Sequence, residues 1–586
     1  MRPIPIVGVL SLVCVACTVS SGGGDSALTN AISDAWEFEK RENPLFATTT
    51  GDKRYDADLP RMREEDLTRR RDTLRVYLQR LDGIDTAGLG VSDRINRTML
   101  RDRLGNWLAT LDAEEDRIPI LADDGFHIDF AQLPTYAPRE TVEDVERYIA
   151  RLNQTPRYFR EYIALMRRGI DQGYTMPRIV LEGYDVTIAT HIVSDPQASV
   201  FYRPLTLLPA AMPDSAKERL RTAARRAIAD SVVAAYREFL SFMNDTYRPA
   251  ARLTTAARDL PGGDSLYYRK VRFYTTLNVT PDSIHAIGLS EVARIEAEMR
   301  QVMQNVGFRG DLKAFIAMLR TNPRFYAKTP DELIQYASWI AKKMDGKLPA
   351  LFGRLPRQPY TVEKVPDHLA PKYTGGRYVD APIESPEPGR YWVNTYNLSS
   401  RPLYVLPSLT LHEAVPGHHL QRSLTQELEG LPEFRRYTYV NAFGEGWGLY
   451  SERLGIEAGM YSDPYADFGR LTYEMWRACR LVVDTGLHWQ RWTRDQAMQY
   501  MADRTALSLH EVRTETDRYI AWPGQALAYK MGELTIRRLR GEAEQALGPR
   551  FDVRGFHDAV LANGTVTLGV LEEQVRTWVQ SRRDSL

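Results

Sequence analysis

Apolar residues recur three and four positions apart through the first two thirds of the chain. Three stretches show this spacing clearly, residues 143–165, 215–243 and 282–306. Since an α-helix has 3.6 residues per turn, this spacing collects the apolar side chains on one helix face and predicts a largely helical chain. Proline and glycine separate the stretches, and Pro281 directly after Thr280 is typical of a helix start.

The pattern changes in residues 373–407, where aromatic, β-branched and turn residues replace the helical spacing. The strongest strand candidate in the chain is the segment 389–396, which reads Gly-Arg-Tyr-Trp-Val-Asn-Thr-Tyr. This composition predicts a small β-sheet. Helical spacing returns after about residue 410, so the fold class that we expect is mainly α with a small sheet (α+β).

The first residues have the pattern of an export signal. Residues 1–16 carry one arginine and then an apolar run that is too short to span a bilayer. Cys17 follows and opens a Ser/Gly-rich stretch, an arrangement that resembles a bacterial lipoprotein signal cleaved before an acylated cysteine. We therefore expect a lipid anchor at Cys17, a flexible tether over residues 17–30, and a protein that faces the periplasm or the cell surface. An ordinary cleaved signal, which would give a soluble periplasmic protein, is the alternative.

Charge and cysteine content narrow the possible functions. The chain of 586 residues has 76 lysines and arginines and 76 aspartates and glutamates, so no net charge attracts it to nucleic acid, and we expect no nucleic-acid partner. We also expect no membrane contact other than the lipid anchor. Of the three cysteines, Cys14 and Cys17 lie in or beside the signal, which leaves Cys479 without a partner for an internal disulfide.

A metal-binding pattern stands at the start of the last third of the chain. His412, Glu413, His418 and His419 bring three of the ten histidines and a glutamate into eight residues. In the zinc motif H-E-x-x-H, two histidines one helical turn apart bind the ion, and the glutamate between them acts as a general base. The pattern therefore predicts Zn²⁺ as cofactor, with His412 as a ligand and Glu413 as the base.

The second histidine is displaced from the position of the motif. A regular helix turns ~100° per residue, so His418 would point away from His412, whereas His419 would share its face but lie ~10 Å along the axis. Pro416-Gly417 lies between them, and this pair kinks or bulges a helix. A bulge of two residues would bring His418 to the position of the second ligand.

The third ligand is expected some two dozen residues downstream. Glu445 and Glu452 are seven residues apart on a predicted helix, so they share a face. One can bind the metal while the other orients a histidine. We favour Glu445 as the ligand, since Gly444 and Gly446 allow close approach around it, and Glu452 as the residue that orients a histidine.

Four sequence blocks together resemble a known family. They are His412–Gln421, Glu445–Glu452, Asp484–His488 and Pro523–Tyr529. The chain resembles, from about residue 34 to residue 582, the bacterial family catalogued as domain of unknown function 885, which is grouped with the zincin metallopeptidases. The resemblance implies that His418 is the ligand and His419 its neighbour. It also implies a zincin-like architecture, mostly helical, with a small sheet that lines the cleft.

Helical metallopeptidases of this size form two lobes around one cleft. We therefore expect a mainly helical lobe over residues 31–370 and a zinc-binding catalytic lobe over residues 371–586. The predicted reaction is the hydrolysis of short peptides by metal-activated water, with Glu413 as general base, in a carboxypeptidase or an oligopeptidase. His488 and Tyr529 lie in the family blocks and are the candidate donors to the developing oxyanion.

Asp484 precedes His488 by one helical turn. It could fix the tautomer of that histidine or cap a turn at Gly486, and the sequence does not separate the two.

Three further residues are candidates for substrate binding. Arg480 and Lys530 could anchor a substrate carboxylate, although long cations beside helices are usually solvated. Asn394 could hold the backbone of a peptide that adds to an edge strand at residues 391–396, which could equally be an ordinary strand.

Two other functions are compatible with the same residues. One is the zinc-dependent hydrolysis of another amide or an ester, which would use every residue named above. The other is a non-catalytic surface lipoprotein that binds a structural metal. We disfavour the second, because structural zinc usually has four protein ligands, often cysteines, whereas here a glutamate stands beside the first ligand where a base is needed.

Overall fold

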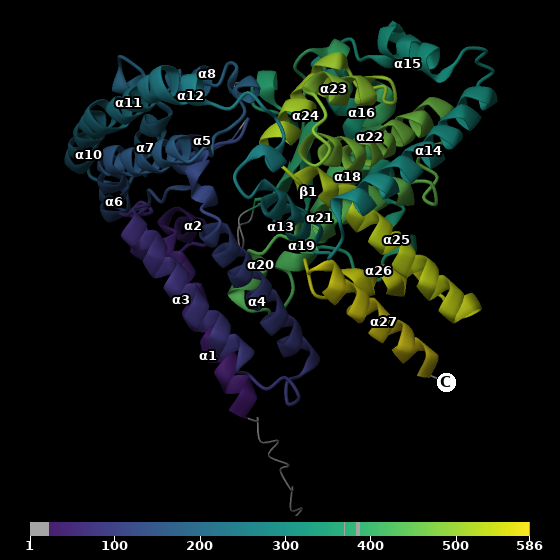
Figure 1. Ribbon diagram of the computed structural model, residues 1–586, viewed down its shortest axis with the longest axis horizontal. Coiled ribbons are helices and arrows are strands. Elements are labelled where there is room, and N and C mark those ends of the chain that lie inside the picture. The colour runs from purple at the N-terminus through teal and green to yellow at the C-terminus, as the bar shows by residue number, and fades with distance from the viewer. Residues whose placement is uncertain (1–22, 123, 368–369, 382–386, 585–586) are drawn as a thin grey trace, which may run out of the picture.

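The chain folds into helices that form two groups, which lie to the left and to the right in Figure 1. The computed structural model describes residues 23–122, 124–367, 370–381 and 387–584. The predicted signal and Cys17 lie outside the described residues. The tether predicted over residues 17–30 is helical from Gly23 onward, because Leu28 is already packed into the core.

The left-hand group contains α1 to α12. Their bounds are α1 (Gly23–Glu42), α2 (Pro44–Thr49), α3 (Glu64–Asp82), α4 (Val91–Asp112), α5 (Phe126–Tyr136), α6 (Val142–Asn153), α7 (Thr155–Asp171), α8 (Asp185–Ala189), α9 (Arg203–Thr206), α10 (Asp214–Ala227), α11 (Ala234–Phe242) and α12 (Arg248–Ala250). The helix expected over residues 143–165 is two helices, α6 and α7, which meet at Gln154. The helix expected over residues 215–243 runs through α10, a π-helical segment and α11.

The remaining helices lie to the right in Figure 1, apart from α20, which lies beside α4 and contacts it through Arg435 and Asn96. They are α13 (Gly263–Thr275), α14 (Pro281–Asn305), α15 (Leu312–Thr321), α16 (Pro330–Asp345), α17 (Leu348–Leu351), α18 (Leu406–Glu413), α19 (His418–Gln426), α20 (Glu433–Arg436), α21 (Asn441–Leu454), α22 (Pro464–His488), α23 (Arg494–Ala502), α24 (Leu509–Ala521), α25 (Ala528–Leu547), α26 (Val553–Leu561) and α27 (Leu568–Asp584). The expected start of α14 is confirmed, since the Thr280 hydroxyl accepts a hydrogen bond from the Ser283 N–H and Pro281 follows it.

Helices α13 to α16, which precede the predicted boundary of residue 370, lie with the right-hand group in Figure 1. Helix α14 packs along α22, and the contact is close at Gly288, where a Cβ atom would lie 2.8 Å from side-chain atoms of Leu481 and Val482. Helix α22 is central to this group, because every residue from Phe468 to His488 is buried. Its surroundings therefore decide which of its polar side chains can reach a substrate.

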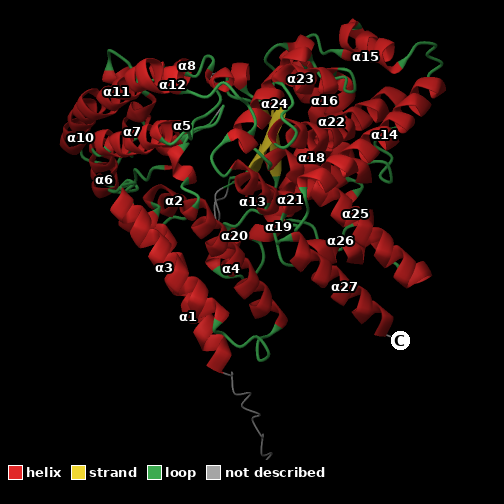
Figure 2. Cartoon of the chain, viewed as in Figure 1, coloured by secondary structure: helices red, strands yellow, loops and turns green. Residues whose placement is uncertain are grey.

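The sheet has three strands, β1 (Tyr360–Lys364), β2 (Gly376–Val379) and β3 (Gly389–Val393). Their order is β1-β3-β2, with β1 parallel and β2 antiparallel to β3. Figure 2 shows this sheet among the helices, as expected for a mainly α protein. The strand predicted near residue 391 exists, but its prediction as an edge strand is wrong: β3 is central, and β2 is the edge strand nearest to α18.

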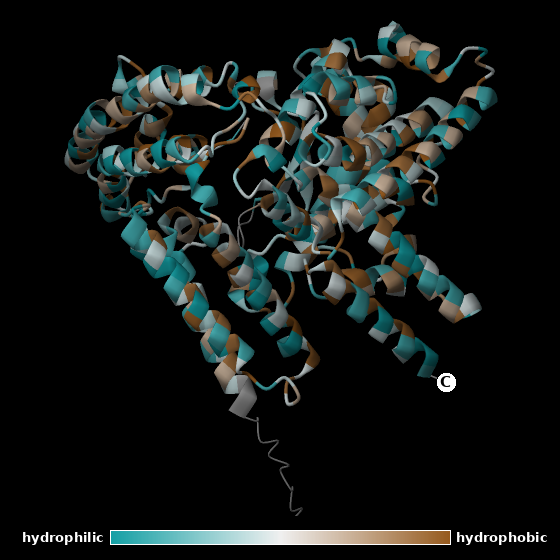
Figure 3. Cartoon of the chain, viewed as in Figure 1, coloured by the Kyte–Doolittle hydropathy of each residue, from teal (hydrophilic) through white to brown (hydrophobic). Residues whose placement is uncertain are grey.

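Hydrophobic and hydrophilic residues alternate around the surface helices (Figure 3), as the amphipathic spacing predicts. Within the part of the chain that is described, no helix combines the length and the apolar character that crossing a bilayer requires.

Candidate metal centre

The H-E motif lies at the end of one helix, and the second histidine lies at the start of the next. The chain between α18 and α19 contains a cis Val415–Pro416 bond and Gly417. The sequence predicted a bulged helix here, and the structure has a complete break. A Cβ atom on Gly417 would lie 1.9 Å from the backbone oxygen of His412, so only glycine allows this close return of the chain. The return brings the ring of His418 to 4.7 Å from that of His412, between centroids.

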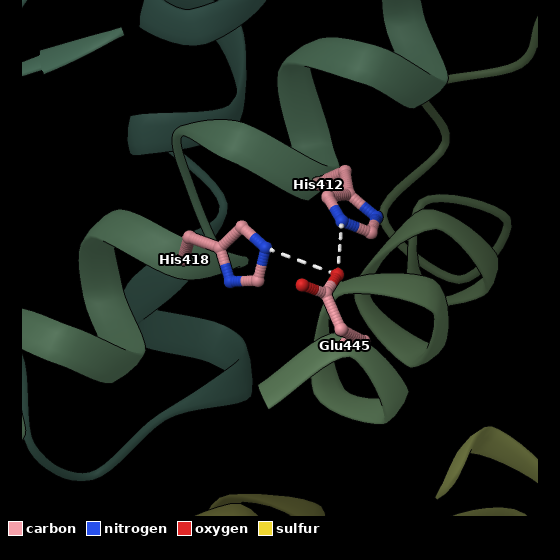
Figure 4. A group of neighbouring side chains, drawn as sticks. All are labelled: His412, His418 and Glu445. Carbon is pink, nitrogen blue, oxygen red and sulfur yellow. Dashed lines mark ion pairs between the residues drawn. The ribbon is translucent and has the colours of Figure 1, made fainter. Parts of the chain in front are cut away.

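The side chains of His412, His418 and Glu445 point toward one another (Figure 4). The distances from Glu445 Oε2 are 3.5 Å to His412 Nε2 and 3.6 Å to His418 Nε2. Tetrahedral zinc ligands at ~2.0–2.1 Å from the ion are separated from one another by ~3.3–3.4 Å, so this donor set fits one ion. Of the alternatives left open by the sequence, the structure brings together His418 and Glu445, each from its own helix.

A buried carboxylate contacts the His412 ring at the nitrogen that does not face Glu445. Glu452 Oε1 lies 2.8 Å from His412 Nδ1, which fixes Nε2 as the nitrogen that faces Glu445. Arg477, which the sequence did not indicate, lies 3.3 Å from the same carboxylate oxygen. Glycine at 448 gives the imidazole its space, because a Cβ atom there would lie 2.6 Å from the ring. The predicted orienting role of Glu452 therefore matches its position.

The charges at this site favour a cation. Burial alone would lower the pKa of His412, but hydrogen bonds with Glu445 and Glu452 outweigh burial and raise this pKa to about 9. Burial alone would raise the pKa of Glu445, but its contacts with His412 and His418 hold it well below the ordinary value. The pocket thus keeps Glu445 ionised and stabilises a positive charge beside it.

Glu413 lies beside this cluster, next to the edge strand β2. The backbone N–H of Tyr378 donates a hydrogen bond to Glu413 Oε2 at 2.8 Å. This bond leaves the other carboxylate oxygen available and fixes the orientation of the side chain. Glu413 is therefore held in a fixed orientation directly after His412 in the chain.

Two tyrosines approach the cluster from other segments. Tyr529 is half-buried, and its ring lies 6.5 Å from that of His412, between centroids, at an interplanar angle of 23°. Its hydroxyl has no hydrogen-bond partner among the described residues, so it is available to a ligand. Tyr439, which the sequence analysis missed, donates a hydrogen bond from its hydroxyl to Glu445 Oε1 at 3.2 Å. Its ring occupies the space left by the missing side chain of Gly444.

A cation was also missed. Arg377 is an exposed residue of β2. Partial enclosure lowers the pKa of its guanidinium, but Tyr373 and the charges of Glu413 and Glu445 raise it overall. Arg377 is thus close enough to both carboxylates for their charges to act on its guanidinium. The sequence shows only a single arginine in a short strand segment, and no motif around it indicates that it lies near the metal-binding residues.

His419 is separated from the cluster, as the family resemblance implied. Its Nδ1 lies 3.1 Å from the Tyr378 hydroxyl and 3.2 Å from the Ser423 hydroxyl. Burial lowers its pKa to about 4, so the imidazole is neutral and serves the packing of α19 against the sheet.

The prediction that His488 donates to an oxyanion is wrong. Its Nδ1 accepts from the Ala257 N–H at 3.0 Å, and its Nε2 donates to the Tyr519 backbone oxygen at 2.9 Å. Both nitrogens are therefore used inside the protein. Asp484 neither orients this histidine nor caps Gly486.

Asp484 instead binds two groups far away in the sequence. Its carboxylate accepts a hydrogen bond from the Tyr267 hydroxyl at 2.6 Å and another from the Gly524 N–H at 3.1 Å. It thereby holds the turn that precedes Tyr529.

The predicted substrate anchors are also engaged internally. Lys530 is fully buried, and its Nζ lies 2.9–3.0 Å from Glu291, Glu474 and Glu533, so its prediction as an anchor is wrong. The prediction that Asn394 holds a substrate backbone is wrong as well. Its side-chain amide donates to three backbone oxygens of residues 370–374 and thereby fixes the segment before β2.

Arg480 is buried but only partly satisfied. Its Nε donates to the Tyr519 hydroxyl at 2.7 Å, and its Nη2 lies 3.1 Å from Glu515. Its guanidinium lies 4.3 Å from the centroid of the Tyr529 ring. This position makes it a support of Tyr529 rather than an exposed anchor.

Comparisons with known proteins place the chain among bacterial proteins. The family model described as a bacterial protein of unknown function (DUF885) matches residues 44–575. A crystal structure described as the "putative lipoprotein" from Colwellia psychrerythraea is 28% identical with a TM-score of 0.89, over 95% of this chain and 99% of that one. A "putative lipoprotein of unknown function" from Shewanella oneidensis shares the fold at 18% identity and a TM-score of 0.72, over 94% of this chain and 99% of that one. None of the curated proteins matches the chain.

Proposed function

The chain belongs to the bacterial family of unknown function DUF885, and from its candidate metal centre we propose that it is a zinc-dependent peptidase that hydrolyses short peptides. The observation that carries the proposal is the convergence of two imidazole nitrogens and one carboxylate within 4.8 Å of one another. Three protein ligands are the usual set of a catalytic zinc site, whereas a structural site normally has four. The zincin-like arrangement that we propose is α18, α19 and α21 around the ion with the edge strand β2 beside them.

His412, His418 and Glu445 would hold the ion. When bound, Zn²⁺ would act as a Lewis acid on water and on the scissile carbonyl. The remaining steps belong to the side chains. Glu413 takes a proton from the attacking water on its free carboxylate oxygen and delivers it to the amine nitrogen as the C–N bond breaks. The Tyr378 N–H keeps this carboxylate in place.

Two side chains are suited to stabilise the charge that develops on the carbonyl oxygen. The Tyr529 hydroxyl is free to donate a hydrogen bond, and the Arg377 guanidinium carries a positive charge near Glu413 and Glu445. Donors of this kind act most strongly when they are held in position before the reaction. Arg480 supports the ring of Tyr529 from within the core.

We also propose that the protein is exported and anchored by a lipid on Cys17. Two observations support this: the cysteine after the apolar leader in the sequence, and the description of both structural neighbours as lipoproteins. The catalytic body would then face the periplasm or the cell surface.

A test separates catalysis from metal binding alone. The purified protein is loaded with zinc and offered a library of short peptides, other amides and esters, with and without a chelator. Glu413→Gln should retain zinc but reduce kcat by ~10²–10⁴-fold, while Glu429→Gln, a change at an exposed glutamate, should leave turnover intact. Peptide turnover that survives both chelation and Glu413→Gln would refute the mechanism, and turnover of esters alone would refute the peptidase assignment.

A further inference from the structure

The two carboxylate oxygens of Glu445 have different neighbours. Oε2 lies 3.5 Å from His412 Nε2 and 3.6 Å from His418 Nε2, and Figure 4 draws both contacts to this one oxygen. Oε1 accepts a hydrogen bond from the Tyr439 hydroxyl at 3.2 Å. Oε2 is therefore the oxygen placed to share an ion with the two imidazoles, while Oε1 is engaged by the protein.

Tyr439 lies just before α21, the helix that carries Glu445, and two features fix its ring. The ring occupies the space of the missing side chain of Gly444, where a Cβ atom would clash with its hydroxyl and ring carbons. The guanidinium of Arg422 lies over the other side of this contact, 5.1 Å from the ring centroid, a distance at which a cation is attracted to an aromatic ring. Packing and charge thus hold the hydroxyl at Oε1.

Arg422 connects this tyrosine to the rest of the candidate metal centre. It follows His418 by four residues in α19, so the two side chains lie on the same face of that helix. Its Nε donates to Asp380 Oδ1 at 2.6 Å, and Asp380 directly follows β2, the edge strand that holds Glu413. The support of Tyr439 therefore comes from the same helix and strand that carry His418 and hold the general base.

A carboxylate can bind zinc through one oxygen or through both. If both oxygens of Glu445 were bound, the two imidazoles and this carboxylate would supply four protein donor atoms, the number that is typical of a structural zinc site. With Oε2 alone, three protein donors leave the fourth position to water. Turning Oε1 toward the ion would break its hydrogen bond with Tyr439, so this bond favours ligation through Oε2 alone.

We propose that Tyr439 is a positioning residue whose hydroxyl holds Glu445 in one-oxygen ligation and thereby keeps a place on the ion open to water. This inference rests on the zinc centre of the proposed function, and it holds for peptides and for other amides or esters alike. Tyr439 acts on the reaction only through Glu445. In this it differs from Tyr529, which we propose as a donor to the reacting carbonyl.

The test removes the hydroxyl and keeps the ring. Tyr439→Phe still fills the space beside Gly444, so the fold should be retained. In crystals of the zinc-loaded proteins, we expect Glu445 Oε1 to lie outside the coordination shell of the wild type and to bind the ion in the variant. With cobalt(II) in place of zinc, the visible d–d absorption in solution should shift between the two proteins, because it responds to the ligand set. At saturating zinc, kcat should fall by ~10–100-fold while the metal remains bound.

Tyr77→Phe is the matched control. The Tyr77 hydroxyl also donates one hydrogen bond at 3.2 Å, to the backbone oxygen of Asp34 in the left-hand group of helices. Loss of this bond should leave the cobalt spectrum and kcat as in the wild type. A change of the spectrum in both variants would show that the shift does not report on Glu445, and would overturn the inference.

The other outcomes separate this inference from the proposed function. Zinc bound through both oxygens of Glu445 in the wild-type crystal would overturn the inference and leave the zinc centre standing, and so would identical cobalt spectra of the wild type and Tyr439→Phe. If no substrate is cleaved, the peptidase assignment fails, but the crystals and the spectra still decide the role of Tyr439. A wild-type protein whose zinc is not bound by His412, His418 and Glu445 would overturn both.

Discussion

Replacing Gly448 with alanine tests the candidate metal centre with a single methyl group. A Cβ atom at this position would lie 2.6, 2.7 and 2.9 Å from three atoms of the His412 ring, whereas ordinary contacts begin at 3.4 Å. The imidazole must therefore move by about 0.8 Å, which is the difference between 3.4 and 2.6 Å. Because metal–ligand distances tolerate only about ±0.2 Å, His412 cannot keep its place in the ligand set.

The expected loss can be stated as a free energy. Displacement of one of three ligands should weaken zinc binding by about 100-fold or more, or ~2.7 kcal/mol. At a zinc concentration of ~100 times the wild-type Kd, bound zinc stabilises the wild-type fold by ~2.7 kcal/mol and the variant by only ~0.4 kcal/mol. Without zinc, Gly448→Ala should change the unfolding free energy by less. Alanine stabilises a helix by ~1 kcal/mol relative to glycine, which offsets part of the ~1–3 kcal/mol that the displaced ring costs.

Competition with a chromophoric chelator measures the zinc affinity, and thermal unfolding with and without zinc measures the linked stability. Gly541→Ala is the matched control, because this glycine also lies inside a helix and a Cβ atom there meets nothing within 4 Å. The control should keep wild-type zinc affinity. Wild-type affinity in Gly448→Ala itself would show that the ring of His412 is not part of the zinc site.

Four further predictions concern single residues around the site. Glu452→Gln removes the charge behind His412 and should weaken zinc binding by ~10–100-fold in the same chelator competition; an unchanged Kd would show that the 2.8 Å contact has no influence on the metal. Tyr529→Phe should lower kcat by ~10²–10³-fold with zinc content unchanged, and a full wild-type kcat would exclude the hydroxyl as a donor in the reaction. Lys530→Met removes the buried cation that three carboxylates share and leaves them only their arginine partners. It should cost ~3–5 kcal/mol of unfolding free energy, measured by urea denaturation; a loss of peptide affinity without a loss of stability would restore its role as an anchor. Burial raises the pKa of Asp484 to about 7, so its contribution to stability is complete below the ordinary pKa near 4 and is lost as the pH rises through about 7. Between pH 5 and pH 8, the unfolding free energy of Asp484→Asn should therefore fall less steeply with pH than that of the wild type. Identical slopes for the two proteins would contradict the raised pKa.

Local pattern was sufficient to predict the helices, the central strand and the ligand candidates. The spacing of apolar residues fixes which face of a helix is buried, and Pro416-Gly417 marks the place where a regular helix cannot continue. His412 and Glu413 are neighbours in sequence, and Glu445 and Glu452 share one face of a helix. The choice of His418 over His419 needed the family resemblance, and the structure places both as that resemblance implies.

The roles of isolated polar residues could not be predicted in this way. His488 and Lys530 stand in or next to motif blocks, but their partners come from Ala257 and Glu291, more than two hundred residues away. Arg377 and Tyr439 carry no motif and reach the site only because a strand edge and a loop are brought there. A side chain becomes structural or available to a ligand according to the partners that packing gives it.

The sequence by itself therefore determined a mainly helical chain with a small sheet and a group of residues able to hold one divalent ion. Only the tertiary structure decided which strand lies at the edge of the sheet and which polar side chains already have partners inside the protein. The physical reason is the distance along the chain over which each interaction acts. Helix periodicity and backbone breaks are set within a few residues, whereas hydrogen-bond satisfaction and burial depend on segments that meet only when the whole chain has folded.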